Sequence, residues 1–171
     1  IYARPKQSEN DWTMELAEAL ALGTDHMSLY QLTIEPTTRF ATDVRRGIFD
    51  PLDDDNAADL FALTRSMTDA AGLPAYEVSN HARPGQESRH NLTYWRYQDY
   101  IGIGPGAHGR RRNEATVRHK KPENYLSAVA DQSHGIAEAR MLDRREQASE
   151  ALLMGLRLDE WIDLAAIGVR F

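Results

Sequence analysis

The segment His26-Met27-Ser28-Leu29-Tyr30-Gln31-Leu32-Thr33-Ile34 decides the fold class, because it predicts a β-strand between two helices. Apolar and polar residues alternate in its second half, and the strand should end at Glu35-Pro36, because proline has no N–H to donate to a sheet. The preceding helix is predicted to begin after Ser8 and to end at Gly23, and its apolar face is formed by Trp12, Leu16, Ala19 and Leu20.

A second helix and a second strand follow this segment. After a predicted loop that contains Arg45-Arg46-Gly47, the aspartates at positions 53–55 supply an N-cap and early negative charge for a helix that ends at Gly72. Residues 75–79 then predict a strand, and the inward side chains of the helix are predicted to be Leu60, Phe61, Leu63 and Met67. This order implies parallel pairing in an α/β sheet or barrel, with Thr33 and the loop 80–85 facing a ligand at the carboxyl ends of the strands.

The second half of the chain has a different order of elements. Residues 101–107 predict a short strand that runs into tight turns, residues 114–119 predict another strand, and residues 122–131 predict a helix with proline at its start. Asp143 and Glu146 form a capping-box pattern that opens the last long helix. We expect a domain boundary between residues 135 and 143.

Composition excludes several classes of protein. The chain has 171 residues, 42% hydrophobic residues and a net charge of −6, and it has no cysteine. No apolar run approaches the roughly 20 residues that cross a bilayer, so we expect a soluble, cytoplasmic protein. The acidic balance argues against nucleic acid as a partner, and the basic segments 110–112 and 119–121 are interpreted as solvated surface. Any thiolate-held metal cluster must be bound by residues outside this chain.

Two neighbouring motifs indicate a bound cofactor. The run Glu87-Ser88-Arg89-His90-Asn91-Leu92-Thr93-Tyr94-Trp95 offers an imidazole and two aromatic rings, which could ligate a metal and stack on a flat ligand. The turn Gly102-Ile103-Gly104-Pro105-Gly106-Ala107-His108-Gly109 would let the backbone approach a ligand closely. Taken alone, such a turn more often forms a tight loop that binds nothing.

Several segments together give the chain a family resemblance. Residues 1–7, 29–36, 76–85, 90–95 and 102–108 resemble the second half of the HemW-type radical S-adenosylmethionine proteins, which are heme chaperones similar to oxygen-independent coproporphyrinogen III oxidases. The resemblance implies an α/β fold in which residues 1–138 are the C-terminal portion of an incomplete β/α barrel and residues 139–171 begin a small helical, winged-helix-like domain. Both ends of the chain interrupt a structural pattern, so we expect a fragment. The family has glycine and leucine where this chain has Ala3 and Arg4.

The resemblance also implies a binding site for S-adenosylmethionine. Thr33 and His108 match positions that contact this cofactor in the related oxidases. Gly102, Gly104 and Gly106 would leave room for its adenosyl part, and Pro105 would stiffen the turn between them. The family's 4Fe-4S cluster is held by cysteines in the half that this chain does not match.

The segment from His90 to Trp95 matches the HNxxYW signature that accompanies heme binding in the chaperone branch of the family. The resemblance implies that His90 ligates heme iron and that Asn91 orients it. Tyr94 and Trp95 would stack on the macrocycle, while Arg83 or Arg89 would reach a propionate. The alternative is that both aromatic rings belong to the core and that His90 is a structural residue.

The resemblance therefore predicts a fragment of a heme chaperone that binds heme and delivers it to recipient hemoproteins, among which membrane-associated respiratory proteins are possible partners. Coproporphyrinogen III decarboxylation and a cofactor-free interaction module are the alternatives. The fragment alone is not expected to be catalytically competent, and the sequence leaves the enzyme class, the recipient and the oligomeric state open.

Overall fold

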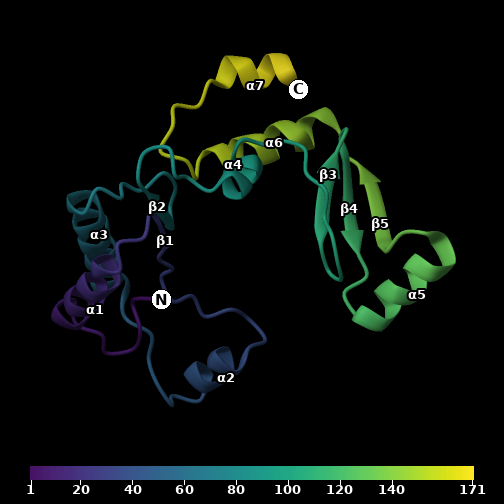
Figure 1. Cartoon of the computed structure of the whole chain (residues 1–171). Helices are drawn as coiled ribbons and strands as arrows, with labels where there is room; N and C mark the ends of the chain where they lie inside the picture. Colours follow the sequence, from purple (N-terminus) through teal and green to yellow (C-terminus); the bar gives the residue numbers. More distant parts are fainter. The chain divides into compact units, whose positions relative to one another are not determined.

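The computed structural model describes all residues from Ile1 to Phe171, and they form two compact units (Figure 1). The first unit is Ile1–Ser88 and the second is Arg89–Phe171. No helix in the chain is both long and apolar enough to cross a membrane. The expected family boundary between residues 138 and 139 stays a prediction.

Two helices form the core of the first unit. Helix α1 (Glu9–Ala21) packs on α3 (Asp54–Ala70), and Leu29 and Tyr2 complete the core between them. The Tyr2 ring stacks on Trp12 with the ring centroids 5.3 Å apart. The remaining buried members of this cluster are Ala3, Leu16, Ala57 and Leu60.

The predicted ends of these helices are confirmed. The Ser8 hydroxyl accepts a hydrogen bond from the Asp11 N–H, and the Ser8 N–H donates one to the Asp11 carboxylate, which makes a capping box. Asp53 caps α3 by accepting from the Asn56 N–H. Beyond the helix ends, Gly23 and Gly72 have φ values of +67° and +76°, which glycine adopts without a Cβ clash.

The prediction of parallel strand pairing is wrong for the two short strands of this unit. Strand β1 (His26–Ser28) pairs antiparallel with β2 (Asn80–Ala82), and parallel pairing is limited to an isolated bridge between Tyr2 and Gln31. Only three residues of the predicted strand 26–34 form β1, and Thr33 lies after it in irregular chain.

A turn in the predicted strand 75–79 explains the reversal. The Tyr76 N–H donates to the Asn80 carbonyl at 3.1 Å, so the chain folds back before β2 begins. The Glu77 carboxylate stabilises this turn, because it accepts from the Ser79 N–H at 3.0 Å and from the Asn80 side-chain amide. The strand therefore forms at residues 80–82, where the sequence predicted a loop.

Helix α2 (Arg39–Arg45) occupies part of a predicted loop. Thr38 is its N-cap and accepts from the Ala41 N–H at 3.2 Å, and Gly47 follows the helix with φ at +66°. The loop prediction was wrong because the helix is short and none of its residues is buried, so it lacks an apolar face.

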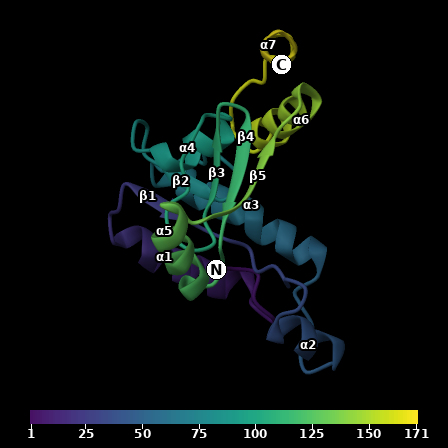
Figure 2. The ribbon, with the colours of Figure 1, turned by 90° about the vertical axis from the view of Figure 1, so that its right-hand side faces the viewer.

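The second unit contains a three-stranded antiparallel sheet with the order β3-β4-β5, in which β4 lies between the other two strands (Figure 2). The strands are β3 (His108–Arg111), β4 (Glu114–Arg118) and β5 (Ile136–Met141), and α5 (Pro122–Gln132) connects the last two. Arg112 and Asn113 both have positive φ, as a two-residue hairpin turn requires. Helices α4 (Arg89–Trp95), α6 (Arg144–Gly155) and α7 (Leu164–Arg170) complete the unit.

The sequence predictions for this unit are partly confirmed. Strand β4, helix α5 and the capping box of Asp143 and Glu146 are present. The predicted strand at residues 101–107 is wrong, because this segment forms turns and β3 starts only at His108. Strand β5 was not predicted, since it is exposed along nearly its whole length and has no apolar alternation.

Replacing Thr64 with valine should destabilise the first unit. The Trp12 indole N–H donates to the Thr64 hydroxyl at 2.8 Å, and both side chains are buried. Thr64→Val keeps the shape but leaves the indole without an acceptor, so we expect urea denaturation to show a loss of about 1–3 kcal/mol. Thr13→Val on α1 is the control, because its hydroxyl only donates to the Glu9 carbonyl near the surface. Equal midpoints for the two variants would contradict the role of the indole hydrogen bond.

The stability of the first unit should fall at acidic pH because of His81. Its side chain is 1% exposed and its Nδ1 lies 2.9 Å from the Thr68 hydroxyl, and burial, together with the charge of Arg65, lowers its pKa. Since the unfolded chain takes up a proton near pH 6.5 and the folded chain does not, the stabilisation is present above that pH and is lost as the pH falls towards the lowered pKa. The decrease in the free energy of unfolding between about pH 7.5 and about pH 5.5 should be smaller in His81→Gln than in the parent chain. In His134→Gln it should equal that of the parent chain. A pH dependence unaffected by His81→Gln would contradict this account.

Candidate functional site

Helix α4 presents the histidine of the HNxxYW motif at the protein surface. His90 and Tyr94 are four residues apart, which places them on one face of the helix, and their rings meet edge to face with centroids 4.7 Å apart. The Tyr94 ring in turn meets Tyr100 at 4.4 Å. The His90 side chain is exposed, so the imidazole is held by an aromatic neighbour and is accessible to a ligand. Whether His90 is a heme ligand or a structural residue stays a prediction.

Trp95 lies in a different environment from His90 and Tyr94. The Arg157 guanidinium lies 4.4 Å from the centroid of its ring, and its indole N–H is buried without a hydrogen-bond acceptor. The ring borders a cavity of about 240 Å³ at α6 and α7, where Trp161 is fully exposed and Ile162 and Phe171 supply further apolar surface. The structure thus brings His90 and Tyr94 together, whereas Trp95 contacts Arg157 instead. Asn91 is partly buried on the same helix, and its orienting role stays a prediction.

The glycine turn is required by the packing of the backbone. A Cβ on Gly102 would lie 2.2 Å from the His108 carbonyl oxygen, so only glycine fits there. Gly104 and Gly106 have φ values of +92° and +73°, which disfavour any other residue. Arg118 on β4 donates to the Gly102 carbonyl at 2.5 Å and holds the turn against the sheet. The contact at Gly102 and the backbone conformation at Gly104 and Gly106 are therefore sufficient to explain these glycines.

The two predicted contacts to S-adenosylmethionine belong to different units. Thr33 is exposed in the first unit, whereas His108 is exposed at the start of β3 in the second. Their common role in one pocket stays a prediction.

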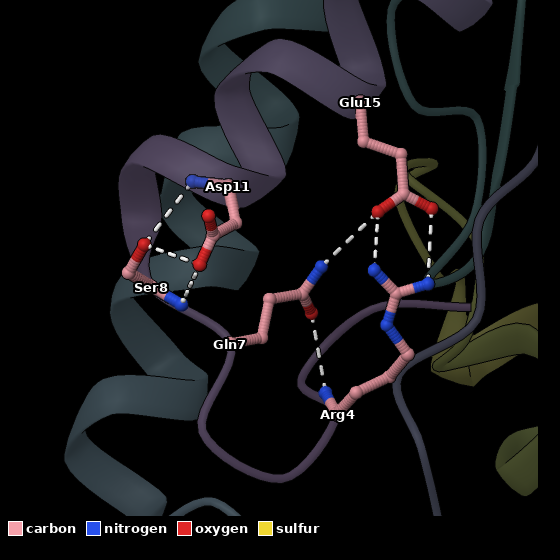
Figure 3. A network of polar contacts seen from close by, with 5 residues as sticks. All are labelled: Arg4, Gln7, Ser8, Asp11 and Glu15. Atoms are coloured by element: carbon pink, nitrogen blue, oxygen red, sulfur yellow. Dashed lines mark hydrogen bonds and ion pairs between the residues drawn. The ribbon is translucent and has the colours of Figure 1, made fainter.

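The N-terminal segment shows how this chain accommodates Ala3 and Arg4. Ala3 is 4% exposed and keeps a positive φ of +56°, a conformation that glycine would adopt without strain. The Arg4 guanidinium makes a two-pronged ion pair with the Glu15 carboxylate, and the Arg4 N–H donates to the Gln7 side chain at 3.2 Å (Figure 3). This network ties the segment to α1.

An arginine stacked on a tyrosine lies next to Tyr100, the ring that Tyr94 contacts. The Arg110 guanidinium carbon is 3.5 Å from the Tyr97 ring centroid and 5.5 Å from that of Tyr100. The Tyr97 hydroxyl donates to the Glu150 carboxylate at 2.7 Å, and burial together with this bond raises the pKa of Tyr97. The sequence analysis missed these residues, although the regular spacing of Tyr94, Tyr97 and Tyr100 was a signal that could have found them.

The acidic and histidine side chains do not form a metal site. No three histidine, aspartate or glutamate side chains come together in an arrangement that could hold a metal ion, and the chain has no cysteine. The residues present therefore do not fit an iron–sulfur cluster.

Comparison with known proteins identifies the family. The chain is 39% identical over 163 residues to the mouse mitochondrial protein called radical S-adenosyl methionine domain-containing protein 1. It is 37% identical over 168 residues to the heme chaperone HemW of Mycobacterium tuberculosis, and 44% identical over 144 residues to that of Escherichia coli. The chain belongs to the HemW family. These alignments cover 91%, 98% and 81% of the chain, but only 37%, 43% and 37% of the respective relatives.

A solved structure supports the fold assignment for this HemW-family chain. The coproporphyrinogen III oxidase HemN of Escherichia coli, described as a radical SAM enzyme, superimposes with a TM-score of 0.76 over 99% of the chain and 42% of the oxidase. The two sequences are 18% identical, so this likeness shows the α/β fold alone. No protein-family model matches the chain.

Substituting Gly102 should test the packing of the turn. Gly102→Ala forces a methyl group against the His108 carbonyl, so we expect the unfolding free energy to fall by about 2–3 kcal/mol. Gly168→Ala is the matched control, because Gly168 lies within α7 with open space around its Cα. There the same change should stabilise the helix by about 0.5–1 kcal/mol. If Gly102→Ala is as stable as the parent chain, the His108 carbonyl does not require glycine at position 102.

Proposed function

We propose that this chain is part of a radical SAM heme chaperone and that it binds heme through His90 and passes it to recipient hemoproteins. The observation that carries the proposal is the identity of 31–44% to proteins named heme chaperone HemW. Because the chain spans between 37% and 43% of the relatives' length, the activity is proposed for the longer protein of which this chain forms a part.

The geometry around His90 supports a role in heme binding. An exposed neutral imidazole is a good ligand for heme iron, and the edge-on Tyr94 ring restricts its orientation. Bound heme would supply an iron atom that the His90 imidazole would ligate. Tyr94 would add an apolar edge beside the macrocycle, and Arg89, which is exposed at the start of the same helix, would be available to a propionate.

The other cofactors are part of the same proposal. The glycine turn and Thr33 would contribute to a site for S-adenosylmethionine, and thiolates outside this chain would hold the 4Fe-4S cluster. The exposed start of β3 at His108 is compatible with a ligand next to the turn. We also propose a cytoplasmic location, which rests on the likeness to the bacterial heme chaperones, whereas other relatives are named as mitochondrial.

Coproporphyrinogen III oxidation is the less favoured function. The HemN structure supports only the fold at 18% identity, whereas the chaperones reach much higher identity. An assay for protoporphyrinogen formation by the gene product that contains this chain separates the two functions. Substantial product without heme binding would favour the oxidase, and absence of both would favour an interaction module.

Hemin titration should reveal the role of His90. We expect the chain to change the Soret absorption of hemin, and we expect His90→Ala to weaken binding or to alter the spectrum, because the variant lacks the iron ligand. His134→Ala is the matched control, since His134 is also exposed but has no aromatic neighbour in the motif. Unfolding of each variant is measured alongside. Hemin spectra identical to the parent chain in a folded His90→Ala variant would reject the ligand role.

A further inference from the structure

A polar cavity in the second unit gathers three arginines. It has a volume of about 230 Å³, and Arg110, Arg144 and Arg170 line it together with Asp99, Asn113 and Gln147. The same cavity is bordered by the rings of Tyr97 and Phe171. It is separate from the exposed His90 side chain, and none of the functions proposed above uses it.

Arg110 is held in place before any ligand arrives. The residue is 7% exposed, its guanidinium lies on the Tyr97 ring at 3.5 Å, and it donates to the Gln98 carbonyl at 3.1 Å. The Glu150 carboxylate lies 3.8 Å from the Arg110 guanidinium. The same carboxylate accepts a shorter hydrogen bond, of 2.7 Å, from the Tyr97 hydroxyl. A guanidinium fixed in this way loses little conformational entropy when it binds an oxyanion.

The other two guanidiniums come from different helices. Arg144 is the first residue of α6, where the positive end of the helix dipole adds to its charge. Arg170 is the last residue of α7, and it is positioned by a hydrogen bond to the Tyr97 carbonyl at 3.0 Å. Both side chains belong to exposed residues, so they can close on a ligand from the solvent side.

The charge balance of the cavity is unusual for this chain. The chain has a net charge of −6, yet the side chains that line the cavity include three arginines and one acidic residue, Asp99. That carboxylate already accepts a hydrogen bond from the Arg112 N–H at 3.1 Å. Like charges around one cavity repel each other, and a bound anion relieves that repulsion.

We propose that this cavity is a binding site for an oxyanion, the carboxylate or phosphate group of a small molecule. Guanidinium groups bind such groups through paired charge-assisted hydrogen bonds, and Gln147 and Asn113 add polar side chains to the same wall. The shared chemistry is an anionic group with two or more oxygens. The proposal does not depend on heme binding.

Calorimetric titration with inorganic phosphate and, separately, with succinate tests the site at low ionic strength. We expect saturable binding of at least one probe, which the double variant Arg144→Gln/Arg170→Gln weakens by at least about tenfold, because two charged donors are removed. Tighter binding of phosphate would indicate a phosphate-bearing ligand, and tighter binding of succinate a carboxylate-bearing one.

The double variant Arg111→Gln/Arg145→Gln is the matched control. It changes the net charge equally at the neighbouring exposed positions, which do not line the cavity, and it should leave affinity within about twofold. In the unsubstituted chain, the NMR signal of the Arg110 side chain should shift as the probe is added. The shift should saturate with the dissociation constant that calorimetry gives. Absence of saturable binding of both probes, equal weakening in both double variants, or an Arg110 signal that does not respond would overturn the proposal.

Discussion

The stacking of the Arg110 guanidinium on the Tyr97 ring is the interaction on which the second unit depends. Arg110 lies on β3, Tyr97 follows α4, and the Glu150 carboxylate on α6 contacts both of them. The last helix joins through Phe171, whose ring meets Tyr97 edge to face at 5.5 Å. Arg110 and Tyr97 thus connect the sheet to α6 and, through Phe171, to the residue that follows α7. Because the cation is buried and paired, loss of either partner would leave an uncompensated charge or hydroxyl.

The local features of this chain were predictable from its sequence, but several long-range features were not. Ser8, Asp53 and Asp143 cap helices as predicted, since capping depends on residues only three positions apart. The prediction of parallel pairing was wrong because the Glu77 side chain stabilises a turn inside the predicted strand 75–79, and the pattern of apolar residues does not reveal those hydrogen bonds. Strand β5 shows the opposite problem, because an exposed strand has no apolar alternation.

In the candidate site, too, the contacts between residues close in sequence were predictable, whereas the contacts between distant residues were not. The contact between His90 and Tyr94 follows from helical spacing, so the motif alone could predict it. The separation of Trp95 from that pair depends on Arg157, which is far away in the sequence, and no local pattern reveals it. Gly102 in the glycine turn is required because the His108 carbonyl leaves no room for a Cβ. The presence of the glycines alone therefore does not indicate a ligand. The proposed site for S-adenosylmethionine therefore rests on the likeness to the family and not on these glycines.

The three tryptophans give each unit its own optical signal. Trp12 is the single tryptophan of the first unit, where it is buried and hydrogen-bonded to Thr64. The second unit contains Trp95, whose ring faces a guanidinium, and Trp161, which is in full contact with water. Indole emission moves to longer wavelength in water, so the two units begin from different spectra. Intrinsic fluorescence can therefore distinguish a chain that melts in one step from a chain whose halves melt independently.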